Sequence, residues 1–368
     1  MSDNNDLFYQ ISLTLVPNIG PVIGRNLVSY CGGVEAIFKE KVSNLSKIPG
    51  VGLERAKAIK SGSFFDRVEK EINFIDKYQI RCLFFTDAQY PRRLKSVDNA
   101  PLLLYFKGNC DLNADRMVAI VGTRKPTESG RQNVEKLVEA LKPYDACIIS
   151  GLAFGVDGLA HKKCIEYDMP NLGVVGHGLD RIYPAEHREL SIKMYRNGGL
   201  ITEFLSGTRP DRENFPMRNR IIAGMCDVLV VVESKIKGGS MITADMANEY
   251  NRDVMAFPGK PQDEYSSGCN ALIKKNKAHL IETADDLVYL MGWENQKKPK
   301  SKQMEIFVEL NAQEEKIVNI IRECREISID DLCYRTQMPS SQMSAYLLGL
   351  EFKGLIRSLP GKRYVLFS

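Results

Sequence analysis

The sequence predicts an α/β fold, in which helices cover a parallel or mixed sheet, with a helical domain before the sheet and a small domain after it. Three observations support this prediction. Short apolar runs alternate with amphipathic stretches from about residue 81 onwards. The first 65 residues instead repeat a Pro/Gly turn, and a basic stretch interrupted by proline sets apart residues 303–368. We therefore expect three domains joined in this order.

Length and composition fit a multidomain globular protein. A chain of 368 residues suggests two or three domains, and 44% hydrophobic and 26% charged residues are ordinary values. The net charge of +4 is small, so any nucleic-acid binding must depend on clustered cations. The nine cysteines include no C-x-x-C pair, and neither a signal peptide nor a membrane span is evident. We expect a cytoplasmic protein with reduced thiols and no membrane contact.

Residues 1–65 contain an internal repeat that predicts a helical domain. The phrase VPNIG at 16–20, followed by Gly24 and Arg25, returns as IPGVG at 48–52, followed by Ala56 and Lys57. Each copy indicates a helix that ends at the turn and a helix that begins after it. The second copy resembles a helix-hairpin-helix motif, whose backbone N–H groups approach DNA phosphates. The alternative is a tight turn that serves helix packing or protein contacts.

The central segment, residues 66–292, predicts a parallel sheet. Short apolar strands separated by helices of about 10–15 residues imply βαβ units whose sheet is covered on both faces. Ligands of such sheets bind beyond the carboxyl ends of the strands. The expected strands are Cys82–Phe85, Leu102–Phe106, Met117–Val121, Ala146–Ser150, Asn171–Val175, Leu200–Phe204, Val228–Glu233, Val254–Phe257 and Ala278–Ile281.

The turns after these strands carry residues suited to phosphate. In the turn GTRK, Gly122 allows close backbone approach, Thr123 offers a hydroxyl and Arg124 a planar fork of donors. The phrase SGLAFG at 150–155, the Gly/Ser turn at 238–240 and PGK at 258–260 predict further anion nests. An ordinary solvated turn is the alternative for the first. Several such turns along one sheet edge favour an extended polyanion over a mononucleotide.

A cluster of polar residues begins the helix that follows the strand expected at 200–204. Arg218, Asn219 and Arg220 lie in its first turn, where positive charge opposes the helix dipole, so an anion is expected there. Phe215 precedes these residues and is suited to stack on a base or sugar. Its alternative role is that of a hydrophobic staple for the helix.

Candidate catalytic groups are few. Asp157 and His161 are spaced i, i+4 and can be read as an acid–base pair, although capping of the helix by Asp157, which would hold His161 in place, is the simpler interpretation. His177 and His187 lack the spacing of metal ligands. We therefore predict a protein that is not an enzyme and that needs neither a metal nor a cofactor.

Taken together, these phrases resemble the DNA-processing protein A family, also called DprA or Smf. The resemblance covers nearly the whole chain and rests on the order of AIVGTRKPTESG, IISGLAFGVDGLAH, GHGLDRIYP, LITEF, NFPMRNRIIAG, GGSMITADMA, VMAFPG and SSGCNALI. It implies an extended Rossmann-like domain between a helix-hairpin-helix (SAM-like) domain and a winged helix. It also implies a homodimer that binds and protects single-stranded DNA and helps to load the RecA recombinase in natural transformation.

The DNA-binding residues follow from the same resemblance. Two departures from the family pattern appear: Gly238 stands where serine is common, and Asn276-Lys277-Ala278 replaces Gly-Ala in the region of the family's dimer contacts. The implied DNA-binding set is Gly122, Thr123, Arg124, Lys125, Ser150, Gly151, Gly155, Phe215, Arg218, Asn219, Arg220, Gly239 and Ser240.

The carboxyl end predicts a linker and a winged helix. Residues 293–302 are basic and interrupted by proline, which is typical of a solvated spacer. Helices are expected at 313–323, 328–335 and 339–353, followed by a turn at 359–364. Ser340, Ser341 and Gln342 would face a DNA groove if this domain binds duplex, but they are not basic, and protein contact is an equal alternative.

The competing function is enzymatic or nucleotide-binding. Related Rossmann-like phosphoribohydrolases carry a P-G-G-x-G-T turn with a nearby catalytic glutamate, whereas this chain has KGGSMIT at 237–243. A nucleotide-phosphate-binding module is a further alternative. The sequence favours a non-enzymatic mediator that holds consecutive phosphates of single-stranded DNA.

Overall fold

A computed structural model gives the fold of the chain. It describes residues 2–293, 310–324, 327–353, 355–359 and 362–366. The chain divides into two compact units, 1–297 and 298–368. The predicted linker at 293–302 lies outside the described residues except for Trp293, which is buried in the core of the first unit.

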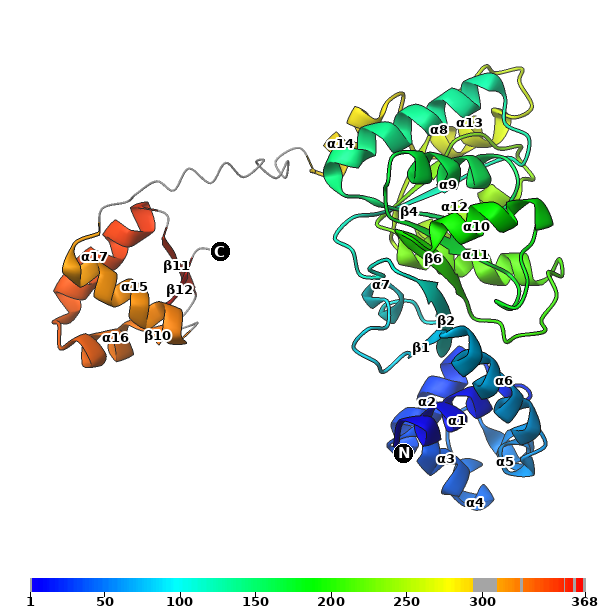
Figure 1. Cartoon of the computed structure of the whole chain (residues 1–368), viewed down its shortest axis with the longest axis horizontal. Coiled ribbons are helices and arrows are strands. Elements are labelled where there is room, and N and C mark those ends of the chain that lie inside the picture. Colours follow the sequence, from blue (N-terminus) through cyan, green and yellow to red (C-terminus); the bar gives the residue numbers. More distant parts are fainter. Residues whose placement is uncertain (1, 294–309, 325–326, 354, 360–361, 367–368) are drawn as a thin grey trace. The chain divides into compact units, whose positions relative to one another are not determined.

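The amino-terminal segment is helical, as predicted. Its apolar side chains form one cluster that also includes Leu103 and Tyr105 of the neighbouring sheet, so this domain and the sheet share a core. Figure 1 shows these helices next to one edge of the sheet. Val68 and Ile75 belong to the same cluster, so the helical domain continues past the predicted boundary at residue 65. The helices are α1 (Ser2–Leu15), α2 (Pro21–Cys31), α3 (Val34–Lys39), α4 (Val42–Leu45), α5 (Gly52–Ser61) and α6 (Phe65–Tyr78).

The two repeated turns of this segment have different surroundings. Helix α2 of the first turn packs so closely on the central domain that a Cβ at Gly24 would lie 2.2 Å from Leu102 Cδ1. In the second turn, Arg55 donates from Nε to Asn18 O and from Nη1 to Gly50 O, both at 2.8 Å. This arginine therefore joins the two turns to each other. The cation that the repeat places in α5, Lys57, stays exposed.

The central sheet has nine strands in the order β1-β2-β6-β5-β4-β3-β7-β8-β9. The pairs β1–β2 and β2–β6 are antiparallel and all the others are parallel, which confirms the predicted mixed α/β class. The chain builds outwards from β3 on one side and then crosses to β7 on the other, so the strand order reverses between β3 and β7. The strands are β1 (Arg81–Phe84), β2 (Leu103–Gly108), β3 (Met117–Val121), β4 (Cys147–Ser150), β5 (Asn171–Val174), β6 (Gly198–Thr202), β7 (Val228–Val231), β8 (Asp253–Ala256) and β9 (His279–Leu280).

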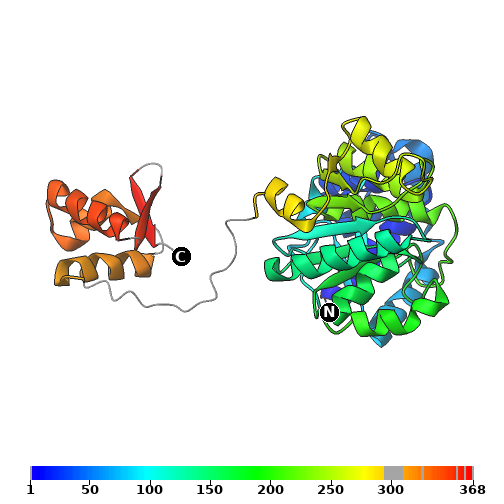
Figure 2. The same ribbon diagram turned by 90° about the horizontal axis from the view of Figure 1, so that it is seen from above.

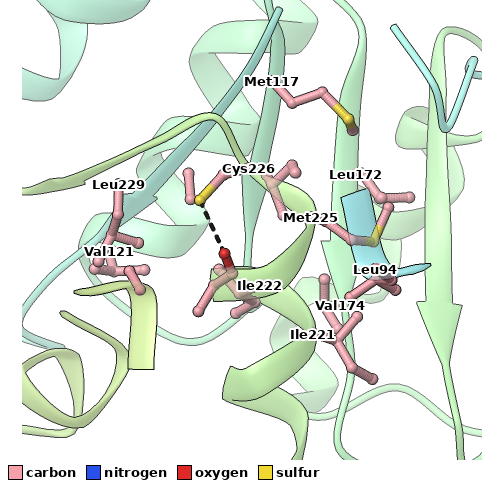
Figure 3. Close-up of a cluster of buried hydrophobic side chains, with 14 of the residues drawn as sticks. Leu94, Met117, Val121, Leu172, Val174, Ile221, Ile222, Met225, Cys226 and Leu229 are labelled. Carbon is pink, nitrogen blue, oxygen red and sulfur yellow. Dashed lines mark hydrogen bonds between the residues drawn. The ribbon is translucent and has the colours of Figure 1, made fainter. Parts of the chain in front are cut away.

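Helices cover both faces of this sheet (Figures 1 and 2). Successive residues of β3 alternate between two buried clusters, because neighbouring side chains of a strand point to opposite faces. On one face Ile221, Ile222 and Met225 pack among Val121, Leu172 and Leu229 (Figure 3). The helices are α7 (Arg92–Lys95), α8 (Glu128–Leu141), α9 (Val156–Glu166), α10 (Arg188–Met194), α11 (Asn214–Met225), α12 (Gly239–Glu249), α13 (Ser267–Lys274) and α14 (Ala284–Leu290).

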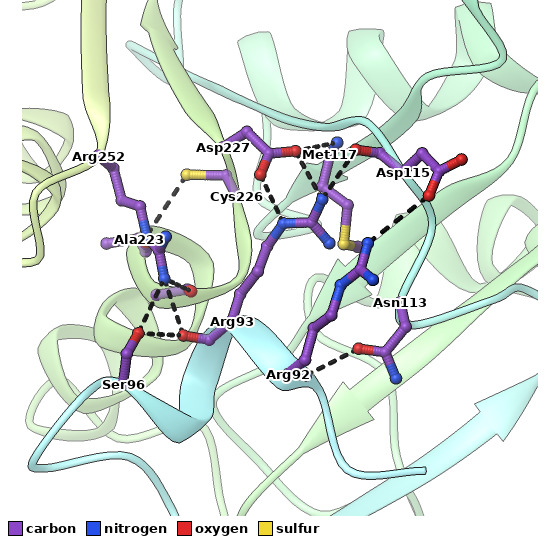
Figure 4. Close-up of polar contacts among 11 residues, drawn as sticks. Arg92, Arg93, Ser96, Asn113, Asp115, Met117, Ala223, Cys226, Asp227 and Arg252 are labelled. Carbon is purple, nitrogen blue, oxygen red and sulfur yellow. Dashed lines mark hydrogen bonds and ion pairs between the residues drawn. The ribbon is translucent and has the colours of Figure 1, made fainter. Parts of the chain in front are cut away.

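Ion pairs and hydrogen bonds connect helix α7 to the amino ends of the central strands. Arg93 of α7 donates from Nε and Nη2 to the two carboxylate oxygens of Asp227, at 2.6 and 2.7 Å. The same carboxylate accepts from the backbone N–H of Met117, the first residue of β3, at 2.8 Å. Arg252, just before β8, donates to the Arg93 carbonyl at 2.8 Å. Figure 4 shows how these contacts join α7 to the starts of β3, β7 and β8.

The second unit is the predicted winged helix. Three helices, α15 (Ala312–Cys324), α16 (Ile329–Thr336) and α17 (Ser340–Phe352), pack against a small antiparallel sheet. Its strands follow the order β10-β12-β11 and span β10 (Ile327–Ser328), β11 (Ile356–Leu359) and β12 (Arg363–Leu366). Ser340, Ser341 and Gln342 are exposed at the start of α17. None of the described helices, here or in the first unit, is long and apolar enough to cross a membrane.

Candidate nucleic-acid interface

A cavity of about 410 Å³ opens at the carboxyl ends of β3 and β7, where the strand order reverses. This is the position at which open α/β sheets bind their ligands. The turn after β3, the starts of α9, α11 and α12, and the turn after β7 line it. The lining residues are Val121, Gly122, Thr123, Arg124, Ala153, Asp157, Phe215, Arg218, Asn219, Ile222, Ser234, Lys235, Lys237, Gly238, Gly239, Ser240 and Thr243.

Hydrogen bonds to Glu233 hold the turn after β3 in place, and the cations of this turn stay exposed to solvent. Thr123 donates its backbone N–H to the carbonyl of Glu233 at 2.8 Å, and Thr127 donates its own to Glu233 Oε2 at 2.9 Å. Thr127 also caps α8 by accepting from the N–H of Gly130 at 3.1 Å. With both sides of the turn fixed, Arg124 and Lys125 remain exposed between them. Arg124 forms no salt bridge within the part of the chain that the structure describes.

Gly155 lets the next turn lie directly against this one. Its φ is +79°, and a Cβ there would lie 2.3 Å from the Thr123 carbonyl oxygen and 2.6 Å from the Arg124 Cα. A side chain at this position would therefore push the arginine turn away from β4 and also strain the backbone. Gly155 thus serves the site by positioning Arg124.

The turn after β4 is not the open anion nest that its glycines predict. The carboxylate of Asp157 accepts the backbone N–H of Gly151 at 3.1 Å and that of Ala153 at 3.4 Å. The hydroxyl of Ser150 donates to the Ile120 carbonyl at 2.6 Å. Asp157 therefore supplies an internal anion to Gly151 and Ala153, while the Ser150 hydroxyl is bonded to the neighbouring strand, so these donors serve the architecture.

Arg218 forms the inner wall of the cavity. Its side chain is buried, and Nη1 donates to the carbonyls of Gly151 and Val174. Burial lowers its pKa to about 10, although the nearby Asp157 acts in the opposite direction. Burial likewise raises the pKa of Asp157, which Arg218 counters. A Cβ at Gly151 would lie 2.3 Å from Arg218 Nη1, so this glycine leaves room for the guanidinium.

Phe215 lies close to two guanidinium groups. The Cζ atoms of Arg124 and Arg218 are each 5.9 Å from the centre of its ring. Cations at this distance are attracted to an aromatic face. Phe215 is only half-buried and lines the cavity, so its ring is available to a ligand as well as to the helix.

Helix α11 begins at Asn214, so Phe215 lies in its first turn, and the prediction that Arg218, Asn219 and Arg220 occupy that turn is wrong. The side chains of Asn219 and Arg220 point in different directions. Asn219 lines the cavity, and its Oδ1 accepts from Arg218 Nε at 3.0 Å. Arg220 does not line it: the guanidinium is buried and bonded to Glu203 and to the Asn99 carbonyl. The sequence thus places Arg218 and Arg220 together, whereas the helix turns their side chains to different neighbours.

The start of α12 offers backbone donors to the cavity. Gly239 is exposed, and the helix has Gly238 at its N-cap with no side-chain hydrogen bond. First-turn N–H groups and the helix dipole favour an anion at such a position. The Ser240 hydroxyl is instead internal, donating to Ser234 Oγ at 2.8 Å. Lys235 pairs with Glu264 at 2.8 Å, while Lys237 is exposed.

Three further groups named from the sequence lie away from the cavity or serve other contacts. Gly259 is bonded to Asn270 outside the lining. His161 bonds through Nδ1 to Asn171 at 3.0 Å rather than to Asp157, and burial lowers its pKa to about 4. The Glu233 carboxylate is occupied by Thr127 and does not line the cavity. No cluster of metal-ligating side chains occurs within the described residues.

Sequence reasoning missed one residue beside the cavity. Tyr183 has its ring centre 6.1 Å from that of Phe215 and is 45% exposed. The signal for it was present in the phrase GHGLDRIYP, but no strand or glycine turn next to this tyrosine indicated a ligand site.

Family models match all three parts of the chain. Residues 81–292 match the model of the family described as DNA recombination-mediator protein A, residues 308–362 a DprA winged helix domain, and residues 11–62 a SAM-like helix-hairpin-helix tandem. Protein Smf of Synechocystis is 30% identical over 98% of this chain and 99% of its own. The DNA processing protein DprA of Bacillus subtilis is 36% identical over 63% of this chain and 79% of its own.

Two solved structures are also similar. The X-ray structure of DNA processing protein A from Streptococcus pneumoniae has a TM-score of 0.68 at 31% identity, covering 77% of this chain and 97% of that one. A structure of DNA processing protein A from Helicobacter pylori, described by its single-stranded DNA binding mode, has a TM-score of 0.54 at 27% identity. It covers 59% of this chain and 97% of that one.

Proposed function

Because the chain belongs to the DNA recombination-mediator protein A family, we propose that it binds single-stranded DNA in the cavity between β3 and β7. The observation that carries this proposal is Arg124, exposed at the cavity mouth with its guanidinium beside the ring of Phe215. A cation for phosphate next to an aromatic face for a base is the combination that single-strand binders use.

The proposed DNA contacts are narrower than the set implied by the family resemblance. Arg124, Lys125, Phe215 and Gly239 offer a charge, a ring or an open N–H to a ligand. The other residues of the set line the cavity wall or hold the turns in place through internal hydrogen bonds and close packing. They are Gly122, Thr123, Ser150, Gly151, Gly155, Arg218, Asn219 and Ser240. Arg220 is left out because its guanidinium is already paired.

The biological role we propose is that of a cytoplasmic recombination mediator. It would protect single-stranded DNA taken up in natural transformation, act as a homodimer and help to load RecA. This part of the proposal rests on membership of the family and on a cavity that offers exposed cations to phosphates, beside carboxylates that are bonded within the protein. Purified full-length protein, RecA and a DNA strand coated with single-strand-binding protein test the loading step directly, by the RecA ATPase rate.

The competing function is hydrolysis of a nucleoside monophosphate. It is disfavoured because the two carboxylates near the cavity are committed: Asp157 to the Gly151 turn and Glu233 to Thr127. Release of free base from a nucleoside monophosphate panel, lost in Glu233→Gln or Asp157→Asn, would support the enzyme and contradict a purely binding role.

The decisive measurement is a salt titration of binding to oligo-dT, to duplex DNA and to mononucleotides. We expect the oligo-dT affinity to be highest and to fall steeply with salt, with a slope of roughly −0.7 per phosphate contacted. Equal affinity for a mononucleotide and a long single strand would instead indicate a nucleotide-sensing module.

A further inference from the structure

Tyr183 is an aromatic side chain left in solvent beside the proposed DNA cavity. Tyr183 is 45% exposed, and an exposed aromatic side chain offers a surface on which a base can stack. Building on the proposed function, we propose that Tyr183 and Phe215 together form a platform on which two consecutive unpaired bases stack. The partner is thereby specified as single-stranded nucleic acid recognised through base faces as well as through phosphates.

The spacing of the two rings supports two bases rather than one. Their centres are 6.1 Å apart and the ring planes are inclined by 36°. Stacked neighbouring nucleotides in a duplex strand are separated by roughly 3.4 Å, so bases resting on these two rings have to be unstacked from each other. Only a flexible single strand opens to this spacing at low cost, which excludes duplex DNA from the platform.

The cations lie at one end of this platform. Arg124 is on the Phe215 side, with its Cζ 5.9 Å from that ring. Tyr183 comes from a different segment, the loop between β5 and α10, and is not part of the cavity lining. The order Arg124, Phe215, Tyr183 therefore gives the strand a path that leaves the cavity over aromatic surface.

Buried hydrogen bonds fix the loop that carries Tyr183. The backbone N–H of Tyr183 donates to Nε2 of the buried His177 at 3.2 Å. Because Nε2 accepts this hydrogen, the ring is neutral and carries its own hydrogen on Nδ1, which donates to the Gly178 carbonyl at 2.9 Å. Thr202 donates its hydroxyl to the His177 carbonyl at 3.0 Å. The loop is thus preorganised, and less conformational entropy is lost when a base binds to the tyrosine.

The test measures binding of full-length protein to a fluorescent oligo-dT strand across a range of salt concentrations. We expect Tyr183→Ala and Tyr183→Leu to weaken binding roughly tenfold with an unchanged salt slope, because a stacking face is lost and no phosphate contact is. Tyr183→Phe is expected to keep the affinity of the unchanged protein. Tyr30→Ala, which removes an exposed tyrosine of α2, is the matched control and is expected to have no effect. The unchanged fold of each variant is checked by circular dichroism.

A second readout uses DNA with a single abasic site moved along the strand. The unchanged protein should lose affinity at two consecutive positions, and Tyr183→Ala should be insensitive at one of them. If Arg124→Ala weakens binding while Tyr183→Ala and Tyr183→Leu do not, the platform is wrong and the proposed function stands. If none of these variants weakens binding, the proposed function fails as well. An equal loss in Tyr30→Ala, or a reduced salt slope in Tyr183→Ala, would also overturn the platform.

Discussion

The two ends of the central sheet both carry arginine, but they use it in opposite ways. At the amino ends of the strands Arg93 is bonded through two nitrogens to Asp227, and Arg252 bonds backbone carbonyls. At the carboxyl ends Arg124 stands exposed, with its Cζ 5.9 Å from the centre of the Phe215 ring. Arginine therefore stabilises the protein at one end of the sheet and is available to a ligand at the other.

This difference shows that the number of cations does not locate a binding site. A buried guanidinium needs a partner from the protein, because leaving it unpaired away from water is costly. Arg218 and Arg220 illustrate the intermediate case, since both are near the carboxyl end and both are satisfied internally. An arginine that is exposed at the switch point between β3 and β7 is the one that can bind phosphate from outside.

The largest expected effect concerns the amino end. Asp227→Ala leaves the buried Arg93 without its carboxylate and the Met117 N–H without an acceptor, and should lower the free energy of unfolding by about 3 kcal/mol. Urea denaturation measures this. Asp115→Ala breaks only the exposed pair with Arg92 and should cost less than about 0.5 kcal/mol. Similar losses in both variants would contradict the distinction between buried and exposed pairs.

Acidification should also lower the free energy of unfolding, because the buried His161 near the amino end of the sheet becomes protonated. Its imidazole is bonded to Asn171, the first residue of β5, and burial lowers its pKa from 6.5 to about 4. The folded state then resists protonation, so this stabilisation is present above pH 6.5 and is lost as the pH falls towards 4. The loss amounts to roughly 3 kcal/mol. Unfolding measured across this range should show a smaller pH dependence in His161→Gln, and an unchanged dependence would contradict the assignment.

Gly155→Ala should damage the carboxyl end through the backbone. The added Cβ meets the Thr123 carbonyl at 2.3 Å in a left-handed conformation, so a loss of about 2 kcal/mol in stability is expected, together with weaker DNA binding. Gly239→Ala is the matched control for stability, because no atom lies within 4 Å of its added Cβ. The free energy of unfolding of Gly239→Ala should equal or slightly exceed that of the unchanged protein. Normal DNA affinity in Gly155→Ala would show that Arg124 does not depend on this close contact.

Arg124→Ala should separate binding from stability. We expect a roughly tenfold loss of affinity for unrelated single-stranded sequences and a salt slope smaller by about 0.7, with unchanged unfolding. Arg92→Ala removes the same charge at the amino end and should change neither affinity nor slope by a comparable amount. Anisotropy titrations at several salt concentrations measure both. An unchanged affinity in Arg124→Ala would contradict the proposal that DNA binds in the cavity.

The smallest expected effect is that of Lys237→Ala. This exposed lysine lines the cavity, whereas its neighbour Lys235 is paired with Glu264. Losing one solvated point charge near a phosphate should weaken binding two- to threefold, or about 0.5 kcal/mol. The same titrations measure this loss of affinity. A larger loss in Lys237→Ala than in Arg124→Ala would show that Lys237 contributes more to DNA binding than Arg124.

The sheet was predictable from the sequence because its strands are apolar on both faces. Met117–Val121 is found with the expected bounds, and the other strands are shifted by one or two residues at their ends. The turn after β3 was recognised because glycine, a hydroxyl and arginine occur together at a strand end. The turn after β4 was misread for a physical reason: its glycines indicate free N–H groups, and Asp157, distant by only a few residues, takes them.

By itself, the sequence determined the α/β class, the order of the domains, the family and the strand ends at which phosphate can bind, because these follow from local periodicity and short motifs. The tertiary structure decided which charges are free. Whether Arg218, Arg220 or Glu233 faces a ligand depends on neighbours from other elements, such as Val174, Glu203 and Thr127. It also decided that Tyr183 lies beside Phe215, since only folding brings the loop after β5 to the start of α11.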